Sequence, residues 1–135
     1  LELLLNYSER FYHRQFITRK AVNNDILTRM EHLLNNYFDK EKGLEEGLPT
    51  VQFLADQLNV TPGYLSDLLR NLTGLNAQQH IHEKLIEKAK EYLTTGNLSV
   101  AEIAYHLGFE HPQSFSKIFR KKTSLSPREY KQSLN

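Results

Sequence analysis

A repeat of about 50 residues constrains the fold of this chain more than any other feature of its sequence. Five residues recur 49 positions later with the same apolar character: Val51, Leu54, Ala55, Leu58 and Val60 correspond to Val100, Ile103, Ala104, Leu107 and Phe109. After a short turn the offset becomes 50: Leu65, Ser66, Leu68, Leu69, Arg70, Thr73 and Leu75 match Phe115, Ser116, Ile118, Phe119, Arg120, Thr123 and Leu125. A repeat of this kind indicates one structural unit used twice.

Each copy has the pattern of a short helix, a turn of about four residues and a second helix. The apolar positions recur at helical spacing on both sides of the turn. Ala55 and Ala104 are small where two helices would cross, while Val60 and Phe109 are apolar within the turn. Together these features predict two helix-turn-helix units. A duplicated helical hairpin that only packs or binds protein, without contacting DNA, remains the alternative.

The whole chain is predicted to be all-α. Strand-like alternation is absent, and helical periodicity is nearly continuous. The predicted helices cover about 1–17, 24–38, 50–58, 61–72, 77–94, 99–107 and 112–122, with a last short helix after Ser126. Thr50, Thr61 followed by Pro62, and Ser99 with Glu102 are the expected N-terminal caps. The charged segment 39–49 contains Gly43 and Gly47 and is predicted to be a surface loop.

These helices divide the chain into four parts. Residues 1–23 are predicted to form an extra N-terminal helix. Because the first five residues, LELLL, have the pattern of the middle of a helix, we expect this helix to be the tail of a missing upstream sensor or dimerisation domain. Residues 24–76 and 95–135 are the two helix-turn-helix subdomains, each a homeodomain-like three-helical unit, and 77–94 is a linker helix. The leucine and aromatic stripe of helix 1–17 either folds back on the domain or pairs with a second copy, since so apolar a stripe is rarely left bare.

The linker helix has a length that suits double-stranded DNA. Eighteen residues at about 1.5 Å each span roughly 27 Å. Successive major-groove faces on one side of a duplex lie about 34 Å apart. A rod of this length can therefore hold two recognition helices in neighbouring grooves.

The distribution of charge along the chain weakly favours a nucleic-acid partner. The net charge is only +1, yet residues 1–76 carry eight Lys/Arg against ten Asp/Glu, whereas residues 77–135 carry nine against six. A basic end is a weak indication of a polyanion partner, and by itself a solvated helix face is the better explanation of such a charge pattern. The chain has no cysteine and no apolar run of membrane-spanning length, so we expect a cytoplasmic protein without a membrane partner.

The segment Leu98–Tyr130, LSVAEIAYHLGFEHPQSFSKIFRKKTSLSPREY, resembles the AraC/XylS family of bacterial transcription regulators. The matching positions are Ile103-Ala104, Gly108-Phe109, Phe115-Ser116, Phe119, Ser126-Pro127 and Tyr130. Residues 50–76 resemble the degenerate first unit of that family, and the resemblance extends over about 25–131. It implies a sequence-specific DNA-binding transcription regulator, with RNA polymerase as a further candidate partner. Ser124 departs from the family's usual glycine, so the exit of the helix 112–122 is expected to differ slightly.

The predicted DNA-facing residues are the polar ones between the apolar positions of each recognition helix. In the first unit they are Thr61, Gly63, Tyr64, Ser66, Asp67, Arg70 and Asn71, and in the second His111, Pro112, Gln113, Ser114, Ser116, Lys117, Arg120 and Lys121. The resemblance implies base-reading roles at Gly63, Ser66, Asp67, Arg70, Pro112, Gln113, Ser116 and Lys117. Arg120, Lys121 and Lys122 are expected to contact phosphates.

Catalysis and cofactor binding are not expected. No glycine-rich phosphate loop and no nucleophile–base arrangement is present. His80, His82 and Glu83 form the one metal-like cluster, but residues two apart on a helix point away from each other. We therefore predict no metal site and no enzyme activity.

Overall fold

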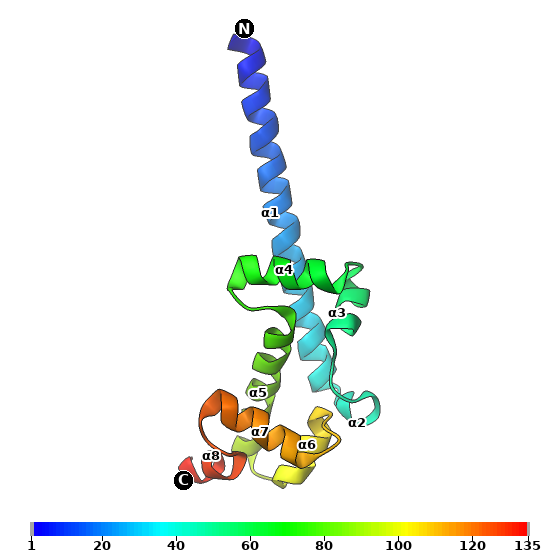
Figure 1. The fold of residues 1–135 in the computed structure, drawn as a ribbon, viewed down its shortest axis with the longest axis vertical. Helices are drawn as coiled ribbons and strands as arrows, with labels where there is room; N and C mark the ends of the chain where they lie inside the picture. The colour runs from blue at the N-terminus through cyan, green and yellow to red at the C-terminus, as the bar shows by residue number, and fades with distance from the viewer. Residues whose placement is uncertain (1, 135) are drawn as a thin grey trace.

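The computed structural model describes the backbone of residues 2–134 and the side chains of residues 21–134. Within that part of the chain all regular structure is helical, as the sequence predicts (Figure 1). The helices are α1 (Glu2–Asp39), α2 (Gly43–Glu46), α3 (Val51–Leu58), α4 (Pro62–Thr73), α5 (Ala77–Thr95), α6 (Val100–Leu107), α7 (Pro112–Thr123) and α8 (Pro127–Ser133). None of the described helices is both long enough and apolar enough to cross a bilayer.

The first helix corrects the expectation of two separate helices. The predicted helices 1–17 and 24–38 are one continuous helix of 38 residues, so the predicted boundary at residue 23 falls inside α1. The intervening segment 18–23 contains neither glycine nor proline, and nothing in it forces the backbone out of the helical conformation. Figure 1 shows the first half of α1 running away from the other helices rather than folding back on them. The side chains of the apolar stripe in 1–17 lie outside the described residues.

The segment 39–49 is also different from the predicted surface loop. It contains the short helix α2, and Gly43 at the start of that helix is buried. Helix α2 packs against α6, so this segment joins the first half of the molecule to the second. Sequence reasoning missed this contact because Gly43 and Gly47 read as loop residues, whereas here they permit close backbone packing.

Local capping interactions explain where the helices begin. The Thr50 and Thr61 hydroxyls accept hydrogen bonds from the N–H groups of Phe53 (3.0 Å) and Tyr64 (3.1 Å). Reciprocal capping boxes start the later helices at Asn76/Gln79, Ser99/Glu102 and Ser126/Glu129. Each cap satisfies backbone donors that the first turn of a helix leaves unpaired. The caps predicted from the sequence at Thr50, Thr61 and Ser99 are therefore confirmed.

A single apolar core runs through both helix-turn-helix units. Ala55 and Ala104 are fully buried at the helix crossings, and Phe109 is 5% exposed in the second turn. The ring of Phe115 lies 5.5 Å from that of Phe109 and 5.8 Å from that of Phe119. The apolar positions of the predicted repeat fill this core. The duplicated sequence pattern therefore reflects how the two units pack.

The repeat extends to hydrogen bonds at the ends of the second helices. Thr73 donates to the carbonyl of Leu69, and Thr123 donates to the carbonyl of Phe119, each at 2.8 Å. Ser124 adopts a left-handed conformation (φ 67°) like its counterpart Gly74 (φ 82°). The expectation that the helix exit would differ at Ser124 is therefore wrong, because the serine adopts the strained conformation instead of altering the turn.

Candidate nucleic-acid interface

Helix α4 of the first unit presents its polar side away from the core. Leu65, Leu68 and Leu69 are buried against the rest of the unit. All seven residues that the sequence predicts to meet DNA lie at least partly exposed: Thr61, Gly63, Tyr64, Ser66, Asp67, Arg70 and Asn71. The helix thus has an apolar face of leucines and an opposite face able to approach a ligand.

Helix α7 of the second unit has the same two-sided arrangement. Phe115 and Phe119 are buried, and Ile118 is packed against the core. The predicted contact residues are again exposed or half-buried: His111, Pro112, Gln113, Ser114, Ser116, Lys117, Arg120 and Lys121. The structure therefore brings each set together on the free surface of one helix.

Three of the predicted contact residues of α4 lie toward the neighbouring helix α1. Tyr64, Asp67 and Asn71 line a groove with Asn23 of α1, and Leu72 lies in the same groove. They therefore occupy the edge of the α4 surface nearest α1. Sequence periodicity could not distinguish this edge, since it depends on where another helix crosses.

An exposed ion pair joins two predicted base-reading residues. Nη1 of Arg70 lies 3.3 Å from Oδ1 of Asp67, and the two side chains are 57% and 75% exposed. Exposed pairs contribute little to stability, and solvent screens them. Arg70 can therefore exchange this partner for a DNA group at little cost.

The last turn of α7 is strongly basic. Arg120, Lys121 and Lys122 lie there, where positive side chains also stabilise the negative end of the helix dipole. Burial lowers the pKa of His82, and the nearby charges of Lys122 and Lys121 lower it further. Lys121 and Lys122 therefore lie close enough to act on the side chain of His82 in the linker helix α5.

The two histidines of the predicted metal-like cluster have separate partners. Nε2 of His80 lies 2.8 Å from the hydroxyl of Thr73, and Nε2 of His82 lies 3.0 Å from Nε2 of Gln78. Burial lowers the pKa of His80, against the opposing effect of nearby Glu31 and Glu83. Both rings are thus occupied in contacts between neighbouring side chains.

Comparison with known proteins agrees with this architecture. A family model described as "Helix-turn-helix domain" matches residues 54–133, which cover most of the first repeat unit and all of the second. The chain belongs to the AraC/XylS family. The matched domain is the DNA-binding domain of AraC-type transcription regulators.

This AraC-type chain is similar to a relative named HTH-type transcriptional activator RhaS from Escherichia coli O157:H7. The two are 35% identical over 79 residues, which cover 58% of this chain and 28% of the relative. The chain thus spans less than a third of the length of that relative.

Two solved structures show the same fold. The C-terminal domain of AraT, a response regulator from Geobacillus stearothermophilus, superposes with a TM-score of 0.69 at 28% identity, covering 80% of this chain and 84% of that one. The DNA-binding domain of AdpA, solved in complex with a target DNA, gives a TM-score of 0.63 at 23% identity, covering 82% and 90%. At 23% identity, the similarity between this chain and AdpA shows a shared fold and nothing more.

Proposed function

We propose that this AraC-type domain reads DNA by inserting α4 and α7 into adjacent major grooves. The observation that carries the proposal is the duplication of one two-sided helix, buried on its apolar side and polar on the other, at the two ends of α5. That linker has 19 residues, or about 28 Å at 1.5 Å per residue, close to the 34 Å between successive grooves. The functional units are residues 24–76 and 95–135, joined by 77–94.

Base recognition falls to the residues near the start and middle of each helix. Gln113 offers a bidentate amide for adenine, and Lys117 reaches the O6 and N7 acceptors of guanine. Asp67 accepts from the N4 amino group of cytosine. The remaining base-reading positions are Gly63, Ser66, Arg70, Pro112 and Ser116.

Phosphate contacts supply affinity without sequence information. Arg120, Lys121 and Lys122 are exposed and clustered, so they suit the sugar–phosphate backbone beside the groove. The capped helix N-termini at Thr61 and Ser99 add backbone N–H donors for phosphate oxygens. We expect the second unit to contribute most of the non-specific affinity because it is the more basic.

We propose two further partners, a second copy of the chain and RNA polymerase. The sequence stripe of residues 1–17, on a helix that extends beyond the others (Figure 1), suits pairing with a second copy of the chain. The name of the RhaS relative, a transcriptional activator, makes RNA polymerase a candidate partner in the cytoplasm. Sedimentation tests the first partner, and a clean monomer would exclude it at the concentration used.

The decisive experiment is a gel shift followed by selection. The protein is mixed with random duplex at low salt, where phosphate contacts are strongest, and bound duplexes are amplified over several rounds. We expect binding that weakens steeply with salt and a selected motif with two conserved blocks one helical turn apart. Complete absence of binding would overturn the proposal in favour of a helical protein-interaction module.

A further inference from the structure

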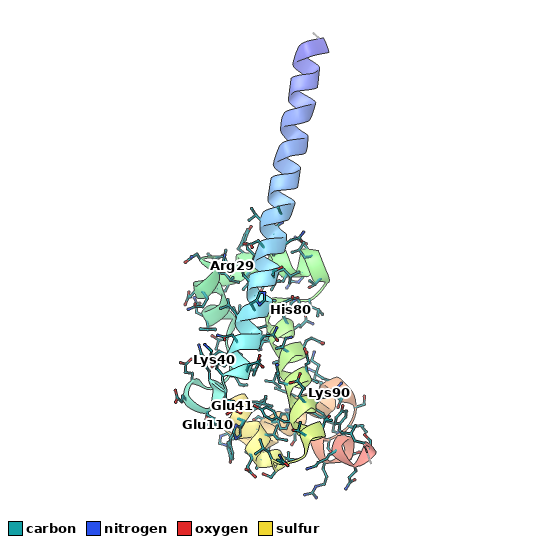
Figure 2. All side chains as sticks on the ribbon, turned by 180° about the vertical axis from the view of Figure 1, so that it is seen from behind. Arg29, Lys40, Glu41, His80, Lys90 and Glu110 are labelled. Carbon is teal, nitrogen blue, oxygen red and sulfur yellow. The ribbon has the colours of Figure 1, made fainter. Side chains whose placement is uncertain are left out.

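The two helix-turn-helix units touch at a second place besides the linker helix. The segment after α1 reaches across to α5 and α6, and Figure 2 shows Glu41 where the end of α1 meets the second unit. We call this contact the junction clamp. It consists of Glu41, Gly43 and Gly47 on one side and Tyr92, His106 and Gly108 on the other.

Glu41 is the residue of the clamp that touches both the linker helix and the second unit. The hydroxyl of Tyr92 donates to Oε1 of Glu41 at 3.1 Å, and Nδ1 of His106 lies 3.4 Å from Oε2. Glu41 holds a left-handed conformation with φ of 53°. That conformation is unfavourable for a residue with a Cβ, and such strain persists only where surrounding contacts enforce it.

The two contacts of Glu41 differ in kind. Burial, reinforced by Glu41, raises the pKa of Tyr92 to about 12, so its hydroxyl stays a donor at neutral pH. Nδ1 of His106 is buried and makes no hydrogen bond within residues 21–134, although Oε2 of Glu41 lies 3.4 Å away. A small rotation of the Glu41 carboxylate would bring Oε2 into hydrogen-bonding geometry with Nδ1 of His106.

Backbone packing forms the other half of the clamp. A Cβ on Gly108 would lie 2.6 Å from the carbonyl carbon of Gly47, and one on Gly43 would lie 2.7 Å from the nitrogen of Gly108. The position equivalent to Gly108 in the first unit is Asn59, which is also left-handed at φ 57°. Glycine is therefore required at 108 by this close approach, which the first unit lacks.

An ion pair lies beside the clamp. Nζ of Lys88 on α5 is 2.7 Å from Oδ1 of Asp39 at the end of α1. It ties the linker helix to the same corner of the first unit. The first unit is thus attached to the second through α5 and through a contact away from the α5 axis.

We propose that the junction clamp, with Glu41 as its positioning residue, sets the relative rotation of α4 and α7 and so selects the half-site spacing that the domain binds. Both units pack on the linker helix α5 through the shared apolar core, which sets their distance and restrains their rotation. A second contact away from the α5 axis acts with a longer lever arm and narrows the remaining rotation of one unit against the other. The spacing claim rests on the proposed function, whereas the rotational claim does not.

The rotational claim is tested without DNA. The chain has no cysteine, so spin labels at Gln57→Cys and Arg128→Cys, both exposed and outside the clamp, report one distance between the units. We expect a narrow distance distribution that broadens in Glu41→Ala. Glu41 is 43% exposed, so the fold should survive the change. An equally narrow distribution in Glu41→Ala would overturn the proposal.

Two variants serve as matched controls. Glu45→Ala removes an exposed carboxylate from the same segment, and it should leave the distribution narrow. Glu41→Gln keeps an oxygen that accepts from Tyr92 and a polar amide beside Nδ1 of His106, whose tautomer can match the amide, so it should behave as the unchanged protein does. Broadening in Glu45→Ala would show that the effect is not particular to Glu41, which would also overturn the proposal.

The spacing claim is tested on duplexes selected from random DNA. On a duplex with two half-sites at the selected spacing, Glu41→Ala should bind about tenfold more weakly, since misaligned units lose simultaneous engagement. On a duplex with one half-site the two proteins should agree within about twofold. An unchanged spacing preference in Glu41→Ala would overturn the claim. If the unchanged protein bound no DNA, the proposed function and the spacing claim would both fall, and the spin-label distances would still decide the role of the clamp.

Discussion

Gly43 and Gly108 lie in direct backbone contact, although 65 positions separate them in the sequence. A Cβ on Gly43 would lie 2.7 Å from the Gly108 nitrogen and from the carbonyl carbon of Leu107. These atoms belong to the end of α6 and cannot move aside as a flexible side chain would. The contact joins the two halves of the molecule without any intervening side chain.

Gly43→Ala is therefore expected to destabilise the protein. Overpacking of this kind lowers the free energy of unfolding by about 1–3 kcal/mol, measurable by urea titration. Gly63→Ala is the matched control, because a Cβ there meets nothing within 4 Å. That control should be neutral or stabilising by up to about 1 kcal/mol. Equal stability of the two variants would contradict the close contact.

The ends of α4 and α7 provide a reciprocal pair of substitutions. Ser124 and Gly74 are equivalent left-handed residues with φ of 67° and 82°. Ser124→Gly should raise the free energy of unfolding by about 1 kcal/mol because the Cβ strain disappears, and Gly74→Ser should lower it by a similar amount. Thermal unfolding measures both. Changes of the same sign would show that strain at these turns does not govern stability.

Lys117 and Lys121 should have different effects on DNA binding. Lys117→Ala should weaken binding to the selected site by about 1–3 kcal/mol and relax the preference at one base position. Lys121→Ala should weaken binding to all duplexes alike and reduce the salt dependence by about one charge. Competition binding against single-base variants of the site distinguishes them. A uniform loss in Lys117→Ala would make Lys117 a phosphate contact.

Tyr92 should make stability sensitive to alkaline pH. Its pKa is raised from 10.0 to about 12 in the folded protein, chiefly by burial and next by Glu41. The folded state thus holds the proton more tightly, so this contribution is complete below pH 10.0 and is lost as the pH rises toward 12. Tyr92→Phe should be about 1 kcal/mol less stable at neutral pH, through the lost hydrogen bond, and should lose less stability on alkaline titration.

Chemical denaturation at a series of pH values measures this difference. The pKa of Tyr37 is also raised by burial, but Tyr37 is present in both proteins and cancels from the comparison. Parallel stability curves for the two proteins would show that Tyr92 does not titrate differently on unfolding.

Much of the interface could be predicted because it depends on local pattern. Leu65 and Phe115 are buried at helical spacing, so the polar residues between such positions, Ser66 and Lys117 among them, must lie on the other side of their helices. Tyr64, Asp67 and Asn71 are predicted on the same polar side, yet they line a groove with Asn23. Periodicity locates a residue on its own helix but not relative to a crossing helix.

The sequence by itself determined the duplicated helix-turn-helix units, their caps and the residues of their core. Each of these depends on propensity, capping and periodicity within a few turns of helix. Only the tertiary structure decided that Gly43 meets Gly108 and that Glu41 joins Tyr92 and His106. These contacts lie between residues about 50 or more positions apart, where no periodic signal connects the partners and only the packing of α2 on α6 brings them together.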